Sequence, residues 1–142
     1  MSSEPPQIDS NLASQFPLQI LLVDDNTINI RVGQLMLKRM GYQPATANSG
    51  QEALTAAEKQ TFDIVFMDVE MPVMDGLQTT RRLRELPEEQ RPKVIVAMTG
   101  NVSDADRQRA TDAGMNDYIT KPIRAEIVQT LLKKWVETLR SA

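Results

Sequence analysis

Cysteine and histidine are both absent from this chain of 142 residues. Without cysteine, the protein cannot form disulfides, thiolate zinc sites or a cysteine nucleophile. Without histidine, it has no imidazole metal ligand, no Ser-His or Cys-His catalytic pair and no phosphohistidine of its own. Any metal must therefore be held by oxygen ligands, which favours magnesium, calcium or manganese over zinc.

An excess of positive charge and a long hydrophobic run are also lacking. The formal net charge is −3 and the pI is about 5.0, so no basic footprint suggests a nucleic acid partner. No apolar run is long enough to span a bilayer, and no signal-peptide pattern follows Met1. We therefore expect a cytoplasmic protein that binds neither nucleic acid nor a membrane.

The first 17 residues differ in composition from the rest of the chain. They contain three prolines, several Ser, Gln and Asn residues and only isolated apolar side chains. Such a segment buries too little apolar surface to offset the entropy that ordering costs. We expect residues 1–17 to be a flexible tail or linker and residues 18–142 to be one domain, with Phe16 and Leu18 touching its edge.

From residue 19 onward, short apolar runs alternate with segments of helical spacing. The runs predict strands at residues 19–24, 42–47, 62–68, 93–98 and 115–120. The segments between and after them predict helices at residues 27–40, 50–60, from residue 75, 103–113 and 124–139. This alternation with short connections predicts an α/β fold whose parallel sheet is covered on both faces.

Three of these helices carry informative side chains. In the helix at residues 27–40, one stripe is apolar and is expected to face the core: Ile28, Val32, Leu35, Met36 and Met40. The helix that begins at residue 75 is expected to turn a basic face to solvent: Arg81, Arg82 and Arg84. The helix at residues 103–113 has alanines as its only apolar side chains, so we expect it to be held loosely.

The order of the strands follows from their composition. Pro44 removes a hydrogen-bond donor from the second strand and so places that strand at a sheet edge. The three most apolar strands belong in the middle, and crossovers are right-handed. The doubly wound order 2-1-3-4-5 satisfies these demands. It puts the switch point, where such folds bind ligands, beside strands 1 and 3.

In that topology, all five strands end at one edge of the sheet. The residues expected there are Asp24 and Asp25, Asp68, Thr99 and Lys121, after strands 1, 3, 4 and 5 respectively. Two carboxylates about 4 Å apart repel each other by roughly 4 kcal/mol at an effective dielectric of 20. Three of them need a cation or must take up protons. Lys121 supplies one positive charge, and a divalent metal is the natural second.

These residues resemble the receiver domain of response regulators, the CheY-like family of two-component signalling. The matching features are Asp24-Asp25, Asp68 with Met71-Pro72 and Asp75-Gly76, Thr99 before a small Gly100, Tyr118, and Lys121-Pro122. The resemblance covers residues 18–139 and is greatest to receivers attached to hybrid sensor histidine kinases. No single feature is specific to this family. The combination is specific, because the features occur in order and each lies at the end of a strand.

The resemblance implies a phosphoacceptor signalling domain. Asp68 would take a phosphoryl group from the phosphohistidine of a histidine kinase or a histidine phosphotransfer protein. Asp25, Asp68 and the main-chain carbonyl of Glu70 would hold Mg²⁺, with Asp24 acting mostly through water. Such transfer needs alignment and charge neutralisation more than covalent help from the protein.

The resemblance also implies a switch. Lys121, which is expected to precede a cis peptide bond, and Thr99 would each contact a phosphoryl oxygen. Tyr118 would turn inward as Thr99 moves. The helix at residues 103–113, the fifth strand and the last helix would then present an altered face to an output partner.

Other function classes remain open at this point. An aspartate-based phosphatase, with Asp68 as nucleophile and Glu70 as general acid, would need a longer chain and leaves Lys121-Pro122 unexplained. A flavodoxin-like module would need a phosphate-cradling loop after the first strand, where acids lie instead. A receiver used only as a binding scaffold is disfavoured because the acids, Thr99 and Lys121 are all present. We therefore expect no enzyme activity beyond the domain's own phosphorylation and dephosphorylation.

Overall fold

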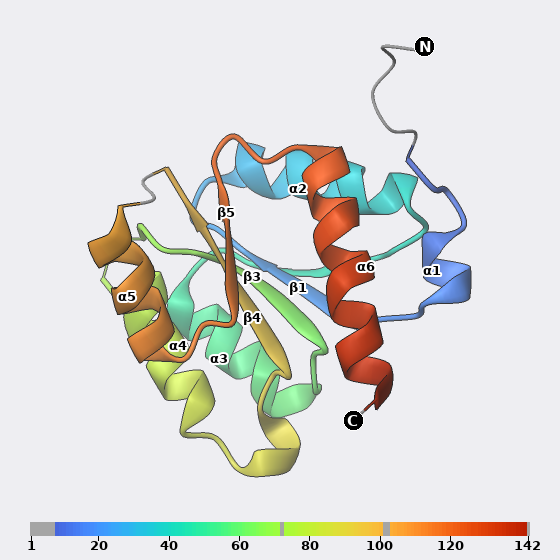
Figure 1. Cartoon of the computed structure of the whole chain (residues 1–142). Coiled ribbons are helices and arrows are strands. Elements are labelled where there is room, and N and C mark those ends of the chain that lie inside the picture. Colours follow the sequence, from blue (N-terminus) through green and yellow to red (C-terminus); the bar gives the residue numbers. More distant parts are fainter. Residues whose placement is uncertain (1–7, 72, 101–102, 142) are drawn as a thin grey trace.

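The computed structural model describes residues 8–71, 73–100 and 103–141. Within these residues, five parallel strands form one sheet in the order β2-β1-β3-β4-β5 (Figure 1). They are β1 (Ile20–Val23), β2 (Ala45–Ala47), β3 (Ile64–Asp68), β4 (Val94–Thr99) and β5 (Asp117–Thr120). Every residue of β1 and β3 is buried, as expected of strands covered on both faces. The predicted α/β fold and its doubly wound strand order are confirmed.

Helices cover both faces of this sheet (Figure 1). One face carries α1 (Leu12–Gln15), α2 (Thr27–Arg39) and α6 (Ala125–Ser141), and the other carries α3 (Gly50–Lys59), α4 (Gly76–Arg84) and α5 (Asp104–Ala113). A 3-10 helix, η1 (Glu88–Gln90), lies between α4 and β4. Each face has its own hydrophobic cluster. None of the helices in the described part of the chain is long and apolar enough to cross a membrane.

The segment before β1 is packed rather than free. Leu12 is completely buried in the cluster between the sheet, α2 and α6. The Ala13 N–H donates to the Met40 carbonyl at 3.0 Å, and the Tyr42 hydroxyl donates to the Phe16 carbonyl at 2.6 Å. The prediction of a flexible tail is therefore wrong for residues 8–17, because one buried leucine and these two hydrogen bonds order the segment. Residues 1–7 lie outside the described part of the chain.

We predict that Leu12→Ala lowers the free energy of unfolding by about 2 kcal/mol, because it deletes buried methyl groups at a site that can only partly collapse. Ser14→Ala, an exposed change on the same helix, should leave stability within about 0.5 kcal/mol. Urea unfolding followed by circular dichroism measures both values. Equal stabilities for the two variants would show that α1 is not packed in solution.

The apolar stripe expected to face inward on α2 lies largely in solvent. Ile28 is 71%, Val32 39% and Leu35 56% exposed. The buried face carries Ile30, Gly33 and Leu37 instead, while Met40 is buried and Met36 packs partly against the core, as predicted. The prediction was wrong for Ile28, Val32 and Leu35 because the helix has apolar residues on two sides, and the closer packing is made by a glycine. A Cβ on Gly33 would lie only 3.0 Å from Leu22 Cδ1.

Arg84 belongs to a structural brace rather than to a solvated basic face. Its guanidinium donates to the Gly114 carbonyl at 2.9 Å, to the Pro92 carbonyl at 2.6 Å and to Asn116 Oδ1 at 2.6 Å. These bonds join α4 to the start of β4 and to the turn before β5. The prediction for Arg84 was therefore wrong, although Arg81 and Arg82 are exposed as expected.

The expectation that α5 has only alanines to bury is confirmed. Its buried residues are Ala110 and Ala113. Ser103 caps the helix by accepting the Asp106 N–H at 3.1 Å, and Gly114 ends it with a φ of 108°. The helix has good ends but little apolar surface against the sheet, so its position should respond readily to changes nearby.

Candidate functional site

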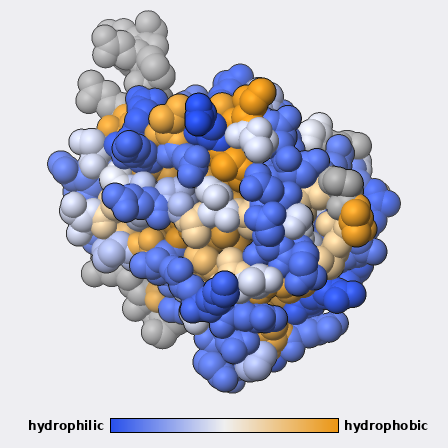
Figure 2. All heavy atoms as spheres, turned by 180° about the vertical axis from the view of Figure 1, so that it is seen from behind, coloured by the Kyte–Doolittle hydropathy of each residue, from blue (hydrophilic) through white to orange (hydrophobic). Residues whose placement is uncertain are grey.

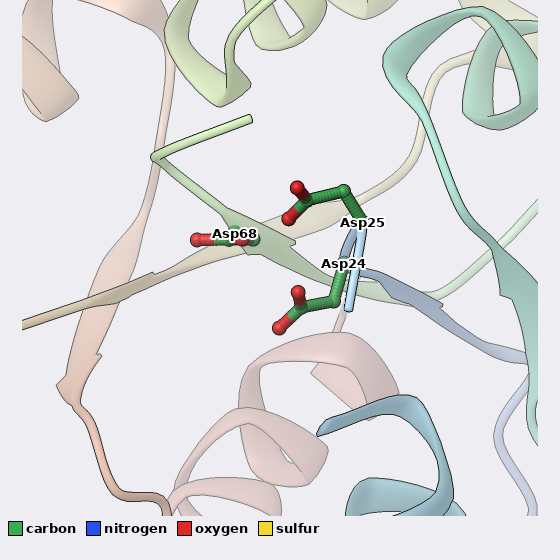
Figure 3. Close-up of side chains that lie close together, drawn as sticks. All are labelled: Asp24, Asp25 and Asp68. Carbon is green, nitrogen blue, oxygen red and sulfur yellow. The ribbon is translucent and has the colours of Figure 1, made fainter. Parts of the chain in front are cut away.

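Three carboxylates lie together at the carboxyl end of the sheet (Figure 3). One oxygen atom each from Asp24, Asp25 and Asp68 lie within 4.8 Å of one another. β1 and β3 are neighbours in parallel register, with Val23 opposite Met67, so the residues that end these strands are brought side by side. Asp24 and Asp68 are 2% and 1% exposed, whereas Asp25 is open to solvent. Such an all-oxygen set fits Mg²⁺, which binds through one or two carboxylates and keeps several waters.

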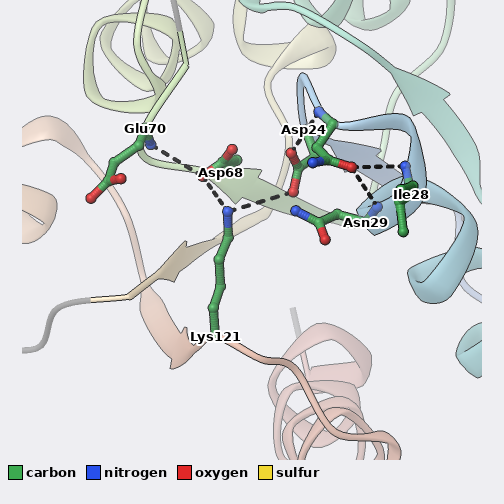
Figure 4. A network of polar contacts seen from close by, with 7 residues as sticks. Asp24, Ile28, Asn29, Asp68, Glu70 and Lys121 are labelled. Carbon is green, nitrogen blue, oxygen red and sulfur yellow. Dashed lines mark hydrogen bonds and ion pairs between the residues drawn. The ribbon is translucent and has the colours of Figure 1, made fainter.

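Lys121, which follows the edge strand β5, completes this cluster (Figure 4). Its Nζ lies 2.9 Å from Asp68 Oδ1 and 3.6 Å from Asp24 Oδ2. The Lys121 N–H donates to the Thr99 carbonyl at 2.8 Å, which ties the segment after β5 to the end of β4. The Lys121-Pro122 peptide bond is cis, as expected. The long side chain thus spans β4 to reach the acids after β1 and β3.

Backbone amides fix the orientation of the acids. The Glu70 N–H donates to Asp68 Oδ1 at 3.1 Å, and the Asn26 N–H donates to Asp24 Oδ1 at 2.9 Å. Asn26 then caps α2, because its Oδ1 accepts the Ile28 N–H at 2.8 Å and the Asn29 N–H at 3.1 Å. The start of α2 therefore holds the loop that carries Asp24 and Asp25.

The start of α4 closes tightly on the end of β3. Asp75 caps this helix by accepting the Gln78 N–H at 2.8 Å. At Gly76, an added Cβ would lie 2.2 Å from the Asp68 carbonyl oxygen. The glycine is needed for this close approach, which positions the backbone around Asp68. Pro72, which belongs to the matching Met71-Pro72 feature, lies outside the described residues.

The negative charges of the site are only partly balanced by Lys121. Burial raises the pKa of the Asp68 carboxyl from 3.8 to about 6; the Lys121 hydrogen bond opposes this shift and the charge on Asp24 adds to it. Burial lowers the pKa of Lys121, but its bond and attraction to Asp68 outweigh burial, so the pKa lies above its usual 10.5. One lysine thus compensates two buried carboxylates incompletely, which leaves the site receptive to a second cation.

The remaining predicted residues lie around a neighbouring cavity of about 90 Å³. Glu70, Thr99 and Tyr118 all line it, together with Arg107. Thr99 ends β4, and Tyr118, in β5, is half-buried. The structure thus brings Asp24, Asp25, Asp68 and Lys121 into one cluster and leaves the other three beside it. Asn101 and Val102, which join Thr99 and Gly100 to the helix at residues 103–113, lie outside the described residues.

Two features of this region were not found from the sequence. The Arg107 guanidinium carbon lies 4.6 Å from the centre of the Tyr118 ring, and only the packing of α5 on β5 shows this contact. A larger cavity of about 390 Å³ lies next to Asp24 and Lys121, lined mainly by apolar groups of α2, the sheet and the segment after β5. Its walls include Val32 and Ile123. Of the stripe predicted to face the core, Val32 lines this cavity.

Comparison with known proteins now gives a consistent result. The family model of the response regulator receiver domain matches residues 20–133. Histidine protein kinase 1 of Candida albicans is 37% identical over 139 residues, which are 92% of this chain but 6% of that protein. The chain therefore spans a small fraction of this curated relative.

Solved structures agree with this match. A receiver domain of a Pseudomonas aeruginosa sensor histidine kinase, with a magnesium ion in its active-site cleft, is 38% identical with a TM-score of 0.76, covering 84% of this chain and 98% of its own. The receiver domain of a Saccharomyces cerevisiae response regulator, co-crystallised with a histidine phosphotransfer protein, is 27% identical with a TM-score of 0.79, covering 86% and 90%.

Proposed function

Because the chain belongs to the response regulator receiver domain family, we propose that its Asp68 accepts a phosphoryl group from a phosphohistidine on a partner. The observation that carries this proposal is the pairing of a buried Asp68 with Lys121 beside two further acids. In the transfer, a carboxylate oxygen of Asp68 forms a bond to phosphorus, the bond from phosphorus to the imidazole nitrogen breaks, and its electron pair stays on the imidazole. The chain has no histidine, so the donor must be another protein or another domain.

The described residues suit the electrostatics of this step. Asp68 Oδ1 is held by Lys121 and by the Glu70 amide before any donor arrives, which fixes the orientation of the carboxylate. We propose that the Lys121 ammonium group moves from Asp68 to a phosphoryl oxygen as charge develops there. We propose that Asp25, Asp68 and the Glu70 carbonyl hold Mg²⁺, with Asp24 acting through water. The metal would supply charge neutralisation between the acids and the phosphoryl oxygens.

The docking face proposed for the donor is the outer side of α2. Ile28, Val32 and Leu35 are exposed there, and Figure 2 shows hydrophobic groups among hydrophilic ones along the upper edge, where α2 runs in Figure 1. No Asp or Glu occurs from residue 26 to residue 51, whereas Arg31 is exposed on α2. A donor that presents apolar groups flanked by acids around its histidine would complement this face.

The signal is proposed to leave through α5, β5 and α6. A phosphoryl group on Asp68 would attract the Thr99 hydroxyl, and Tyr118 would move toward the space beside Thr99. α5 buries only alanines and should follow. The free protein would sample this arrangement, and phosphorylation would shift its population.

We also propose that the receiver comprises residues 18–142 and that residues 8–17 extend it.

The test is the intact mass of the protein after incubation with acetyl phosphate and Mg²⁺. The wild type should gain the mass of one phosphoryl group, and Asp68→Asn should gain none. An unchanged wild-type mass would contradict the proposal and favour a binding scaffold. Multiple turnover of a small phosphoester such as p-nitrophenyl phosphate would instead favour the phosphatase alternative.

A further inference from the structure

The aromatic ring of Tyr118 is contacted by a cationic side chain of α5. The Arg107 guanidinium carbon of α5 lies 4.6 Å from the centre of the Tyr118 ring on β5, within the range of a cation–π contact. Among the described residues, no ion pair is formed by Arg107, whereas Arg109 pairs with Asp106. The aromatic ring is therefore the contact that orients the Arg107 side chain.

The space that Tyr118 would enter lies directly beside this contact. The cavity of about 90 Å³ is lined by both Thr99 and Tyr118, and also by Arg107. A ring that moved into this cavity toward Thr99 would leave the face of the Arg107 guanidinium. The cation–π contact is thus made in one position of Tyr118 and weakened in the other. An interaction that differs between two states biases their populations.

The helix that carries Arg107 buries few side chains. Its buried residues are Ala110 and Ala113, so the Arg107–Tyr118 contact adds a link between α5 and β5. Trp135 adds a connection on the other side, since its Nε1–H donates to Asp117 Oδ2 at 2.9 Å. The residue next to Tyr118 is therefore attached to α6, and a change at Tyr118 can be observed there.

We propose that Arg107 is a positioning residue, which holds Tyr118 at the mouth of the cavity and so sets how readily the phosphorylated arrangement forms. This inference rests on the proposed function, because it requires Asp68 to be the phosphoacceptor. Removal of the guanidinium should favour the inward position of Tyr118. The protein should then reach its switched state at a lower concentration of a phosphoryl mimic.

The experiment is a titration of the full chain with beryllofluoride in the presence of Mg²⁺. The fluorescence of Trp135, the one tryptophan of the chain, reports the change. Arg107→Met should lower the midpoint about two- to fivefold, which is the effect of losing one partly exposed cation–π contact. Arg82→Met, which removes the same charge from an exposed site on α4, should leave the midpoint unchanged.

A second pair of variants separates positioning from a general effect on structure. In a Tyr118→Ala background, Arg107→Met should have no further effect on the midpoint, whereas in a Tyr118→Phe background its full effect should persist. Urea unfolding without beryllofluoride should show Arg107→Met less stable than Arg82→Met by no more than the free energy of the two- to fivefold shift, about 0.4 to 1 kcal/mol, because the lost contact is made in the resting state.

The outcomes of this titration are distinguishable. A wild type that does not respond to beryllofluoride, or an Asp68→Asn variant that responds equally, contradicts the proposed function and this inference with it. A normal wild-type response with no shift in Arg107→Met overturns the role of Arg107 alone. A shift that persists in the Tyr118→Ala background would assign the effect to charge or to α5 stability rather than to the ring.

Discussion

Replacing Asp25 with alanine should slow phosphorylation of Asp68 by acetyl phosphate by roughly 100-fold, the usual loss when one group that neutralises charge is removed from such a site. Asp25 contributes one of the three carboxylate oxygens that lie within 4.8 Å of one another, and it is the one open to solvent. Its loss therefore leaves the buried packing intact while removing a ligand for Mg²⁺.

The same variant should unfold no more easily than the wild type when a chelator is present. Removal of Asp25 relieves repulsion in the metal-free cluster, and an exposed carboxylate contributes little packing. Glu58→Ala, which removes an exposed carboxylate from α3, is the control for net charge. Mass spectrometry gives the phosphorylation rate, and calorimetric titration gives the Mg²⁺ affinity. Undiminished phosphorylation of Asp25→Ala, or of the wild type in excess chelator, would rule out the metal site.

Most of the fold could be predicted because strand burial and chain order constrain each other. Fully apolar strands require cover on both faces, and Pro44 fixes one edge of the sheet. The acids could then be brought together on topology alone, since parallel strands end at one edge. The position of Lys121 at this edge could be predicted by the same argument. Its contacts with both Asp24 and Asp68 could not be predicted, because a flexible side chain has many rotamers.

The errors arose where packing rather than pattern decides burial. The α2 helix has apolar residues on two sides, and the choice between them depends on the close contact of Gly33 with Leu22. A hydrophobicity pattern gives glycine no weight. The N-terminal segment contains one leucine that finds a complementary site between α2 and α6, which composition does not reveal. The partners of Arg84 and Arg107 lie on distant parts of the chain and leave no local signal.

Lys121→Met should lower the free energy of unfolding by about 3 kcal/mol at pH 7 in the presence of a chelator. This value lies at the low end for breaking a buried ion pair, because the Lys121 side chain is 29% exposed. Methionine preserves the apolar stem, so the loss reports the charge. Asp24 and Asp68, at 2% and 1% exposure, would be left together without a compensating cation.

Asp68→Ala should instead stabilise the metal-free protein by about 1 kcal/mol, because it removes the repulsion between Asp68 and Asp24.

The dependence on pH distinguishes this electrostatic cause from a loss of packing. The folded-state pKa of Asp68 is raised from 3.8 to about 6, so the folded protein binds more protons than the unfolded chain between these values. Its contribution to stability therefore falls as the pH rises from about 4 to about 6 and is constant above that range. In Lys121→Met the opposing hydrogen bond is gone, so the pKa of Asp68 rises further and the loss of stability extends to higher pH.

Melting curves at pH 5 and pH 7, with chelator and with Mg²⁺, test this account of Lys121. The difference between Lys121→Met and the wild type should be small at pH 5, where Asp68 is already largely neutral, and large at pH 7. Saturating Mg²⁺ should restore part of the stability at pH 7, because a bound cation takes over the role of the ammonium group. Lys133→Met, an exposed change on α6, should show neither the pH dependence nor the rescue. A deficit of equal size at both pH values would mean that Lys121 acts through packing rather than by compensating the acids.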